Sequence, residues 1–136
     1  MPSQIRVVRS TEMGKGEFTE GIVRDKAFEA EGVLFARSRI AGGVKSGWHH
    51  HGKRKIYGFI VSGRLRFEYE GGKNPVTVDA GDFFHIPVGL VHRDVNPNKH
   101  QEAVVVNIFL GRGPPVVNVP EPQLQRRRLR GNPAED

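Results

Sequence analysis

Alternating hydrophobic and polar residues predict that most of this chain folds into short β-strands. The clearest alternation spans residues 64–70, where Leu65, Phe67 and Tyr69 share one face and charged side chains share the other, because successive side chains of a strand point to opposite sides. Other β-favouring runs, most of them closed by a turn rich in Gly or Pro, predict further strands at 5–8, 33–40, 48–51, 56–61, 76–78 and 83–86.

Residues 103–110 form an almost continuous apolar run. Such a run suits a strand buried on both faces, although periodicity alone also allows a buried helix. Short strands separated by turns are typical of a β-sandwich or β-barrel, and the 17 glycines and 9 prolines support this class. The length of 136 residues suits one domain. We expect an N-terminal strand and loop region at 1–32, a barrel at 33–120 and a short flexible basic tail at 121–136.

Composition excludes several kinds of chemistry. The chain has no cysteine, which removes disulfides, thiolate nucleophiles and cysteine-type zinc sites. Because the N-terminus lacks a long apolar stretch, we expect no signal peptide, no membrane span and a cytoplasmic location. The net charge of +6 suggests an anionic partner, but the basic residues are scattered among acids. The one dense run, Arg126–Arg128 with Arg130, lies in the tail, so nucleic-acid binding is not favoured.

Five of the six histidines lie between positions 49 and 92. On a strand, His49 and His51 would project from the same face while His50 points away. Two such imidazoles can hold one metal ion, with a third ligand from a distant part of the chain. The His-x-His pattern alone does not establish a metal site, since exposed histidine pairs and buried core histidines produce it too.

The segments around these histidines resemble the two motifs of the cupin superfamily. Residues 43–63 contain the Gly, the His-x-His and the closing Gly of the first motif. Residues 81–96 match the second motif at all of its positions: Gly81, Pro87, Gly89, His92 and Asn96. The resemblance covers roughly residues 33–110. It implies an all-β fold, a single jelly-roll β-barrel with a divalent transition metal inside its mouth.

Carried over by position, the resemblance implies that His49, His51 and His92 are the metal ligands. The glutamate ligand of the family has no counterpart, since its spacing falls on Ile56, with the basic Lys55 just before it. Three imidazoles still suit Fe, Mn, Zn or Ni. Without the carboxylate, we expect weaker retention of hard divalent ions and a coordination position open to water or substrate.

Other residues near the motifs have both a functional and a structural interpretation. His85 and Tyr57 are candidate catalytic groups beside the metal, although a histidine bonded to a neighbouring strand is the simpler alternative for His85. Lys53 and Lys55 could attract a carboxylate or phosphate of the substrate toward the mouth, although basic loops are most often only solvated. For Asp94 we expect a loop position without a catalytic role.

These features support two main hypotheses for function. The first is a mononuclear metal-dependent enzyme, a dioxygenase, isomerase or lyase that acts on a small polar or anionic molecule. The alternative is a non-catalytic barrel that binds a small ligand, which the missing glutamate favours and the three histidines oppose. Small cupins commonly dimerise, so we also expect a homodimer, in which Ile5–Val8 or Val116–Val119 adds a strand to a partner's sheet.

Overall fold

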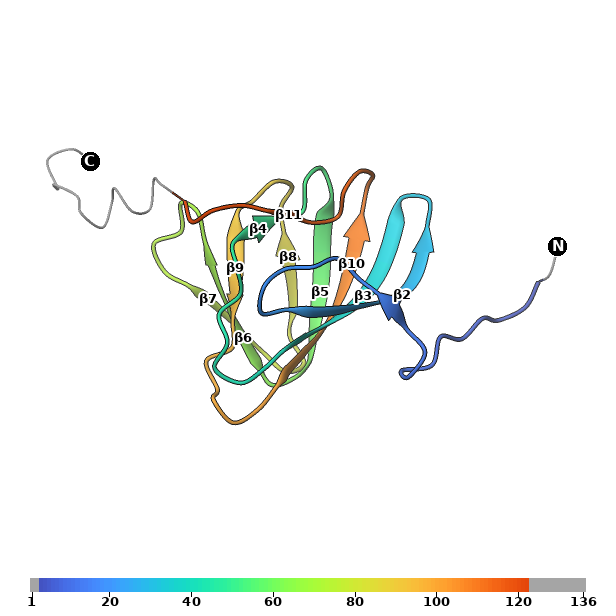
Figure 1. Cartoon of the computed structure of the whole chain (residues 1–136), viewed down its shortest axis with the longest axis horizontal. Coiled ribbons are helices and arrows are strands. Elements are labelled where there is room, and N and C mark those ends of the chain that lie inside the picture. The colour runs from blue at the N-terminus through green and yellow to red at the C-terminus, as the bar shows by residue number, and fades with distance from the viewer. Residues whose placement is uncertain (1–2, 123–136) are drawn as a thin grey trace, which may run out of the picture.

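The computed structural model describes residues 3–122, which consist of β-strands and loops (Figure 1). No helix in this part of the chain is long and apolar enough to cross a membrane. The strands of the described residues are β1 (Gly14–Lys15), β2 (Val23–Ala30), β3 (Val33–Ile40), β4 (His49–His50), β5 (Lys55–Ser62), β6 (Arg64–Tyr69), β7 (Val76–Asp79), β8 (Phe83–Ile86), β9 (His92–Val95), β10 (Ala103–Leu110) and β11 (Val117–Asn118).

Two antiparallel sheets enclose a single hydrophobic core. The first sheet has six strands in the order β1-β2-β3-β10-β5-β8, and the second has five in the order β11-β4-β9-β6-β7. Ile40 and Ile60 from the first sheet and Leu65 from the second are each 0% exposed in the core. The all-β, jelly-roll class of fold predicted from the sequence is therefore confirmed.

The apolar run at 103–110 is β10, a central strand of the six-stranded sheet. It pairs with β3 on one side and with β5 on the other, and alternate residues Ala103, Val105 and Phe109 are buried in the core. The strand prediction is confirmed here and the helix alternative is excluded. The strands predicted at 33–40 and 83–86 also have the observed bounds, and those at 56–61, 64–70 and 76–78 differ by at most one residue at each end.

The strand predicted at residues 5–8 needs correction, whereas the homodimer remains a prediction. Residues 5–8 form no strand, and Ile5 is 93% exposed, because no neighbouring strand pairs with this β-favouring run. The N-terminal region instead supplies β1 and β2, which extend the six-stranded sheet beyond β3. Val117–Asn118 forms β11, which pairs with β4 of the same chain. The predicted basic tail lies, from residue 123 onward, outside the described residues.

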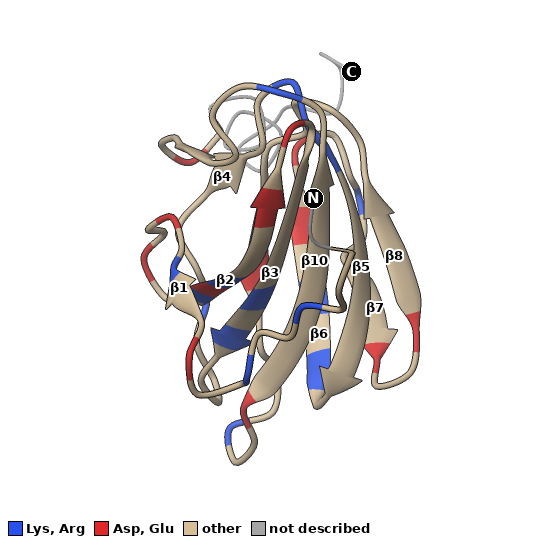
Figure 2. Cartoon of the chain, turned by 90° about the vertical axis from the view of Figure 1, so that its right-hand side faces the viewer, with Lys and Arg blue, Asp and Glu red and all other residues tan. Residues whose placement is uncertain are grey.

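Residues of both charge signs occur on the neighbouring strands β2 and β3, whereas β8 and β10 carry no Lys, Arg, Asp or Glu (Figure 2). Asp25 of β2 accepts hydrogen bonds from Arg37 and Arg39 of β3, at 3.1 and 3.2 Å. Arg37 and Arg39 of this sheet thus face an acidic partner, which agrees with the mixing of basic and acidic residues along the sequence.

Candidate metal centre

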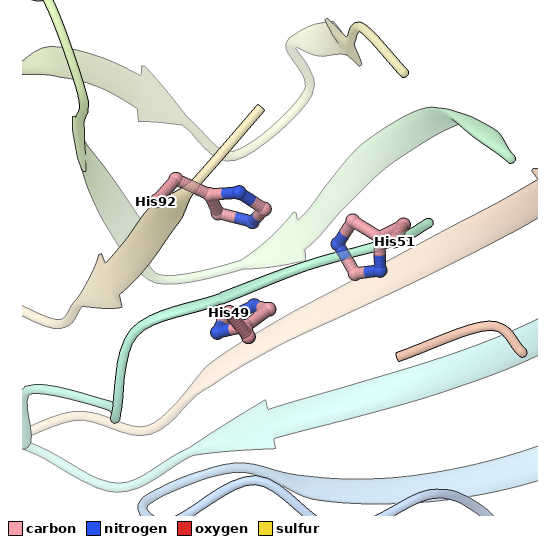
Figure 3. Close-up of side chains that lie close together, drawn as sticks. All are labelled: His49, His51 and His92. Carbon is pink, nitrogen blue, oxygen red and sulfur yellow. The ribbon is translucent and has the colours of Figure 1, made fainter. Parts of the chain in front are cut away.

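Three buried histidines converge inside the barrel (Figure 3). His49 lies in β4, His51 directly follows it, and His92 begins β9, where it pairs with His49 in the register of the sheet. Their candidate ligand nitrogens all lie within 4.8 Å of one another, and each residue is at most 5% exposed. The sequence predicted these three residues as ligands, and the fold brings His92 beside His49 and His51 from a distant part of the chain.

A hydrogen bond from each ring to the backbone fixes which nitrogen faces the centre. The Nδ1 atoms of His49, His51 and His92 each lie 2.9 Å from a carbonyl oxygen, those of Gly47, Pro115 and Leu90 respectively. Because a carbonyl oxygen can only accept, Nδ1 carries the hydrogen, and Nε2 of the neutral ring keeps its lone pair. Backbone carbonyls orient metal-binding imidazoles in the same way in known metal sites.

Burial keeps the three imidazoles neutral. Desolvation is the largest cause that lowers the pKa of His49 to about 2 and the pKa of His51 to about 3, and it also lowers the pKa of His92. The positive charge of the buried Arg24 lowers the pKa of all three rings further. A metal ion binds the neutral form of imidazole, so at neutral pH these ligands need to release no proton.

The donor set fits a transition metal ion. Nε2 of His92 is buried and has no hydrogen-bond partner among residues 3–122. An unpaired polar atom in a protein interior requires an explanation, and a metal ion that accepts the lone pair supplies one. Imidazole nitrogens suit Fe, Ni and Zn and also occur as ligands of Mn. These three histidines are thus positioned to bind a metal ion.

The position where the family places its glutamate is apolar in the structure. Ile56 is 1% exposed and lies on the inner face of β5. Its partner across the sheet is Phe109 of β10, whose ring centroid lies 5.3 Å from that of His51. The wall beside the histidines on this side therefore offers hydrocarbon and no ligand atom, as the sequence predicted.

Asp94 was expected in a loop, and the structure corrects this. Asp94 belongs to β9, two residues after His92 and on the same face, so its carboxylate also points into the barrel. Its Oδ1 atom lies 3.6 Å from Nε2 of His49 and 3.7 Å from Nε2 of His92. The spacing of Asp94 two residues after His92 could have indicated this position, because residues i and i+2 of a strand share a face, as was argued for His49 and His51.

An apolar pocket of about 240 Å³ lies beside His92. Its hydrocarbon lining comes from β6, β7, β8 and the loop before β9, and consists of Phe67, Val76, Phe84, Ile86, Pro87 and Leu90. The rings of Phe67 and Phe84 pack together with their centroids 4.9 Å apart. A molecule that reaches the histidines through this pocket therefore contacts mainly apolar surface.

The remaining candidate residues lie away from the three histidines. His85 borders the pocket, but its exposed ring stacks on that of Tyr57 at 4.6 Å, and its Nδ1 donates to the carbonyl of Ile56 at 3.0 Å. Tyr57 is 43% exposed on the outer face of β5. Lys53 and Lys55 are exposed, and the Nζ atom of Lys55 lies 6.0 Å from the Tyr57 ring. Their attraction of an anion remains a prediction.

These observations define a class: a β-barrel protein with a candidate mononuclear metal centre of three histidines at its interior. The family model described as Cupin domain matches residues 36–109, more than half of the chain. The chain belongs to this family, as its two motifs predicted.

The chain is similar in sequence to one curated protein over a short segment, and in fold to several solved structures. Germin-like protein 8-9 of Oryza sativa subsp. japonica is 40% identical over 42 residues, a segment that makes up 31% of this chain and 19% of that protein. The polyketide cyclase RemF of Streptomyces resistomycificus superposes with a TM-score of 0.72 at 15% identity, covering 94% of each chain. An oxalate oxidase superposes with a TM-score of 0.65 at 25% identity, covering 92% of this chain and 73% of its own.

Proposed function

We propose that this protein is a mononuclear metal-dependent enzyme that acts on a small molecule. The observation that carries the proposal is the convergence of three buried, neutral imidazoles, with their ligand nitrogens within 4.8 Å of one another, beside an apolar pocket. A divalent metal bound there supplies Lewis acidity, and iron would add redox chemistry with O₂. Iron would favour dioxygenase activity, and Mn or Zn would favour isomerase or lyase activity.

The residues of the chain bind, orient and exclude water around this centre. The bonds from Nδ1 to backbone carbonyls hold each ring so that Nε2 faces the centre. Ile56 and Phe109 line the wall beside His51 with hydrocarbon, so water has few polar partners on that side. A metal ion held by three imidazoles would keep coordination positions at which an oxygen atom of the substrate could bind.

The pocket lining indicates what kind of substrate fits. Phe67, Phe84 and Leu90 suit an aromatic ring or an alkyl chain, whereas the metal suits a carbonyl or carboxylate oxygen. We therefore propose a substrate whose polar or anionic group binds the metal and whose apolar part occupies the pocket. Oxalate, named for some structural neighbours, has no apolar part to occupy the pocket, so we do not propose it as the substrate.

Metal content tests the proposed centre directly. We expect at least about half a divalent transition metal ion per chain in the purified protein without a histidine tag, and below about a tenth in His51→Ala. The matched control is His100→Ala, which removes an exposed histidine in the loop before β10, and it should keep the wild-type content. Equal metal content in all three proteins would overturn the proposal.

Turnover distinguishes an enzyme from a binding barrel. Aromatic and alkyl carboxylic acids and ketones are incubated with the metal-loaded protein, and their loss and the uptake of O₂ are followed. Conversion that a chelator abolishes supports the enzyme. Saturable binding of such probes without conversion of any of them would instead favour the non-catalytic barrel.

A further inference from the structure

A buried carboxylate lies beside two of the three metal-binding imidazoles. Asp94 is 9% exposed, and its Oδ1 atom lies 3.6 Å from Nε2 of His49 and 3.7 Å from Nε2 of His92. These separations are too long for hydrogen bonds. Oδ1 itself is buried and has no hydrogen-bond partner within the described part of the chain, and the same holds for Nε2 of His92.

The three atoms facing one another are all electron pair donors. Nδ1 of His49 and Nδ1 of His92 carry the ring hydrogens and donate them to carbonyl oxygens, so both Nε2 atoms present lone pairs. An ionised carboxylate can only accept hydrogen bonds. Three acceptors turned toward one another in a protein interior repel, unless a cation lies between them.

A single metal ion satisfies all three atoms. Adjacent donor atoms at about 2.0 to 2.2 Å from one ion lie about 2.8 to 3.1 Å apart in octahedral coordination and about 3.3 to 3.6 Å apart in tetrahedral coordination. The observed distances of 3.6 and 3.7 Å are at or slightly above the upper end of this range. Asp94 does not belong to the group whose ligand atoms all lie within 4.8 Å of one another, so its carboxylate must shift toward His51 to share the ion. We propose that it does so when the metal binds, and that Asp94 is a fourth ligand of the metal held by His49, His51 and His92. This inference rests on the proposed metal centre. Asp94 would supply the negative charge that the glutamate of the family supplies at the position of Ile56.

Arg24 is the other charged group that faces Asp94. Its guanidinium is buried and donates to Oγ1 of Thr19 at 2.8 Å and to the carbonyl of Glu17 at 3.2 Å. The charge of Asp94 acts on it from outside ion-pair distance, since no ion pair within 4.0 Å joins them in the described structure. Asp94 could therefore serve only to balance the charge of Arg24 at a distance. The experiment has to distinguish this role from that of a metal ligand.

The Co²⁺ affinities of two variants distinguish between these roles. Co²⁺ is titrated into the metal-free wild type, Asp94→Asn and Asp79→Asn, with binding followed by calorimetry and by the visible absorption of Co²⁺. We expect Asp94→Asn to bind at least about 100-fold more weakly and with a changed spectrum, since even groups beyond the ligands contribute 10–100-fold. Asp79, an exposed partner of Arg64, is the matched control, and its variant should match the wild type.

Each outcome bears on one proposal. Wild type that binds no Co²⁺ would overturn the proposed metal centre itself. Wild-type affinity and spectrum in Asp94→Asn, with or without a loss of thermal stability, would leave the three-histidine centre intact and overturn ligation by Asp94. If Asp94→Asn does not fold, a crystal structure of the Co²⁺-loaded wild type decides: Oδ1 within about 2.2 Å of the ion supports ligation, and a distance above about 3 Å overturns it.

Discussion

Nδ1 of His51 donates a hydrogen bond to the carbonyl oxygen of Pro115 at 2.9 Å, which ties the candidate metal centre to the segment after β10. The same segment continues into β11, which pairs with β4 immediately before His51. The orientation of His51, a candidate ligand from the first motif, therefore depends on residues that lie outside both motifs.

Shortening the chain tests this dependence. A chain ending at residue 112 lacks the Pro115 carbonyl and β11, so we expect metal affinity to fall by about 10–100-fold, as for other groups that orient metal ligands. A chain ending at residue 122 keeps both and is the control, expected to bind as the full chain does. Calorimetric titration with Co²⁺ measures the difference, and equal affinities of the two shortened chains would contradict the prediction.

The lowered pKa values of the buried histidines predict that the metal-free protein is sensitive to acid. His49 and His51 have folded-state pKa values of about 2 and about 3, against 6.5 for an unperturbed histidine. Below pH 6.5 the unfolded chain therefore binds protons that the folded chain does not. The free energy of unfolding should therefore decrease as the pH is lowered from about 6.5 to about 3, by up to about 1.4 kcal/mol per pH unit for each histidine.

Urea unfolding in the presence of a chelator measures this slope between about pH 7 and pH 5. His100→Ala removes an exposed histidine and should keep the wild-type slope. A free energy of unfolding that stays constant or rises as the pH falls over this range would show that the three rings are already charged in the folded protein.

Gly58 gives the pocket wall its shape. A Cβ atom at this position would lie 2.1 Å from the ring of Phe84, which lines the pocket. We expect Gly58→Ala to lower the free energy of unfolding by about 1–3 kcal/mol, the usual effect of overpacking. In Gly14→Ala the new Cβ meets only ordinary contacts at 3.9 Å and beyond, so a smaller effect is expected. Thermal unfolding compares the two, and equal melting temperatures would argue against close packing of Phe84 on Gly58.

Asn96, the last position of the second motif, has a structural role in this protein. Its side-chain amide donates to the carbonyls of Ile40 and Gln101 at 3.0 and 2.8 Å, and its Oδ1 accepts from the backbone of Asn98 at 3.0 Å. We expect Asn96→Ala to lower the free energy of unfolding by about 2–4 kcal/mol, because buried backbone groups lose their partners. The exposed Asn98 provides the control Asn98→Ala, expected to cost less.

Metal binding by folded Asn96→Ala separates the structural role from ligation. Once folded, this variant should bind Co²⁺ with nearly the wild-type affinity, since Asn96 contacts backbone and no ligand nitrogen. A large loss of affinity without a loss of stability would contradict the assignment.

Local pattern determined most of the strands. Residues 33–40, 83–86 and 103–110 have the predicted bounds because alternation and turn residues act over a few positions of the chain. Residues 5–8 have an equally β-favouring composition but form no strand, because a strand also requires a neighbour that offers its backbone groups. The composition of a segment does not show whether such a neighbouring strand exists.

The sequence by itself determined the all-β class through the spacing of residues along its strands, and it determined the barrel and the three histidines through the resemblance of its two motifs to those of the cupin family. Only the tertiary structure placed the carboxylate of Asp94 beside His49, the carbonyl of Pro115 beside His51, and an apolar pocket beside His92. Each of these depends on the pairing of β9 with β4 and of β11 with β4, and on the packing of one sheet against the other. Such long-range register follows from the whole core and cannot be read from any one segment.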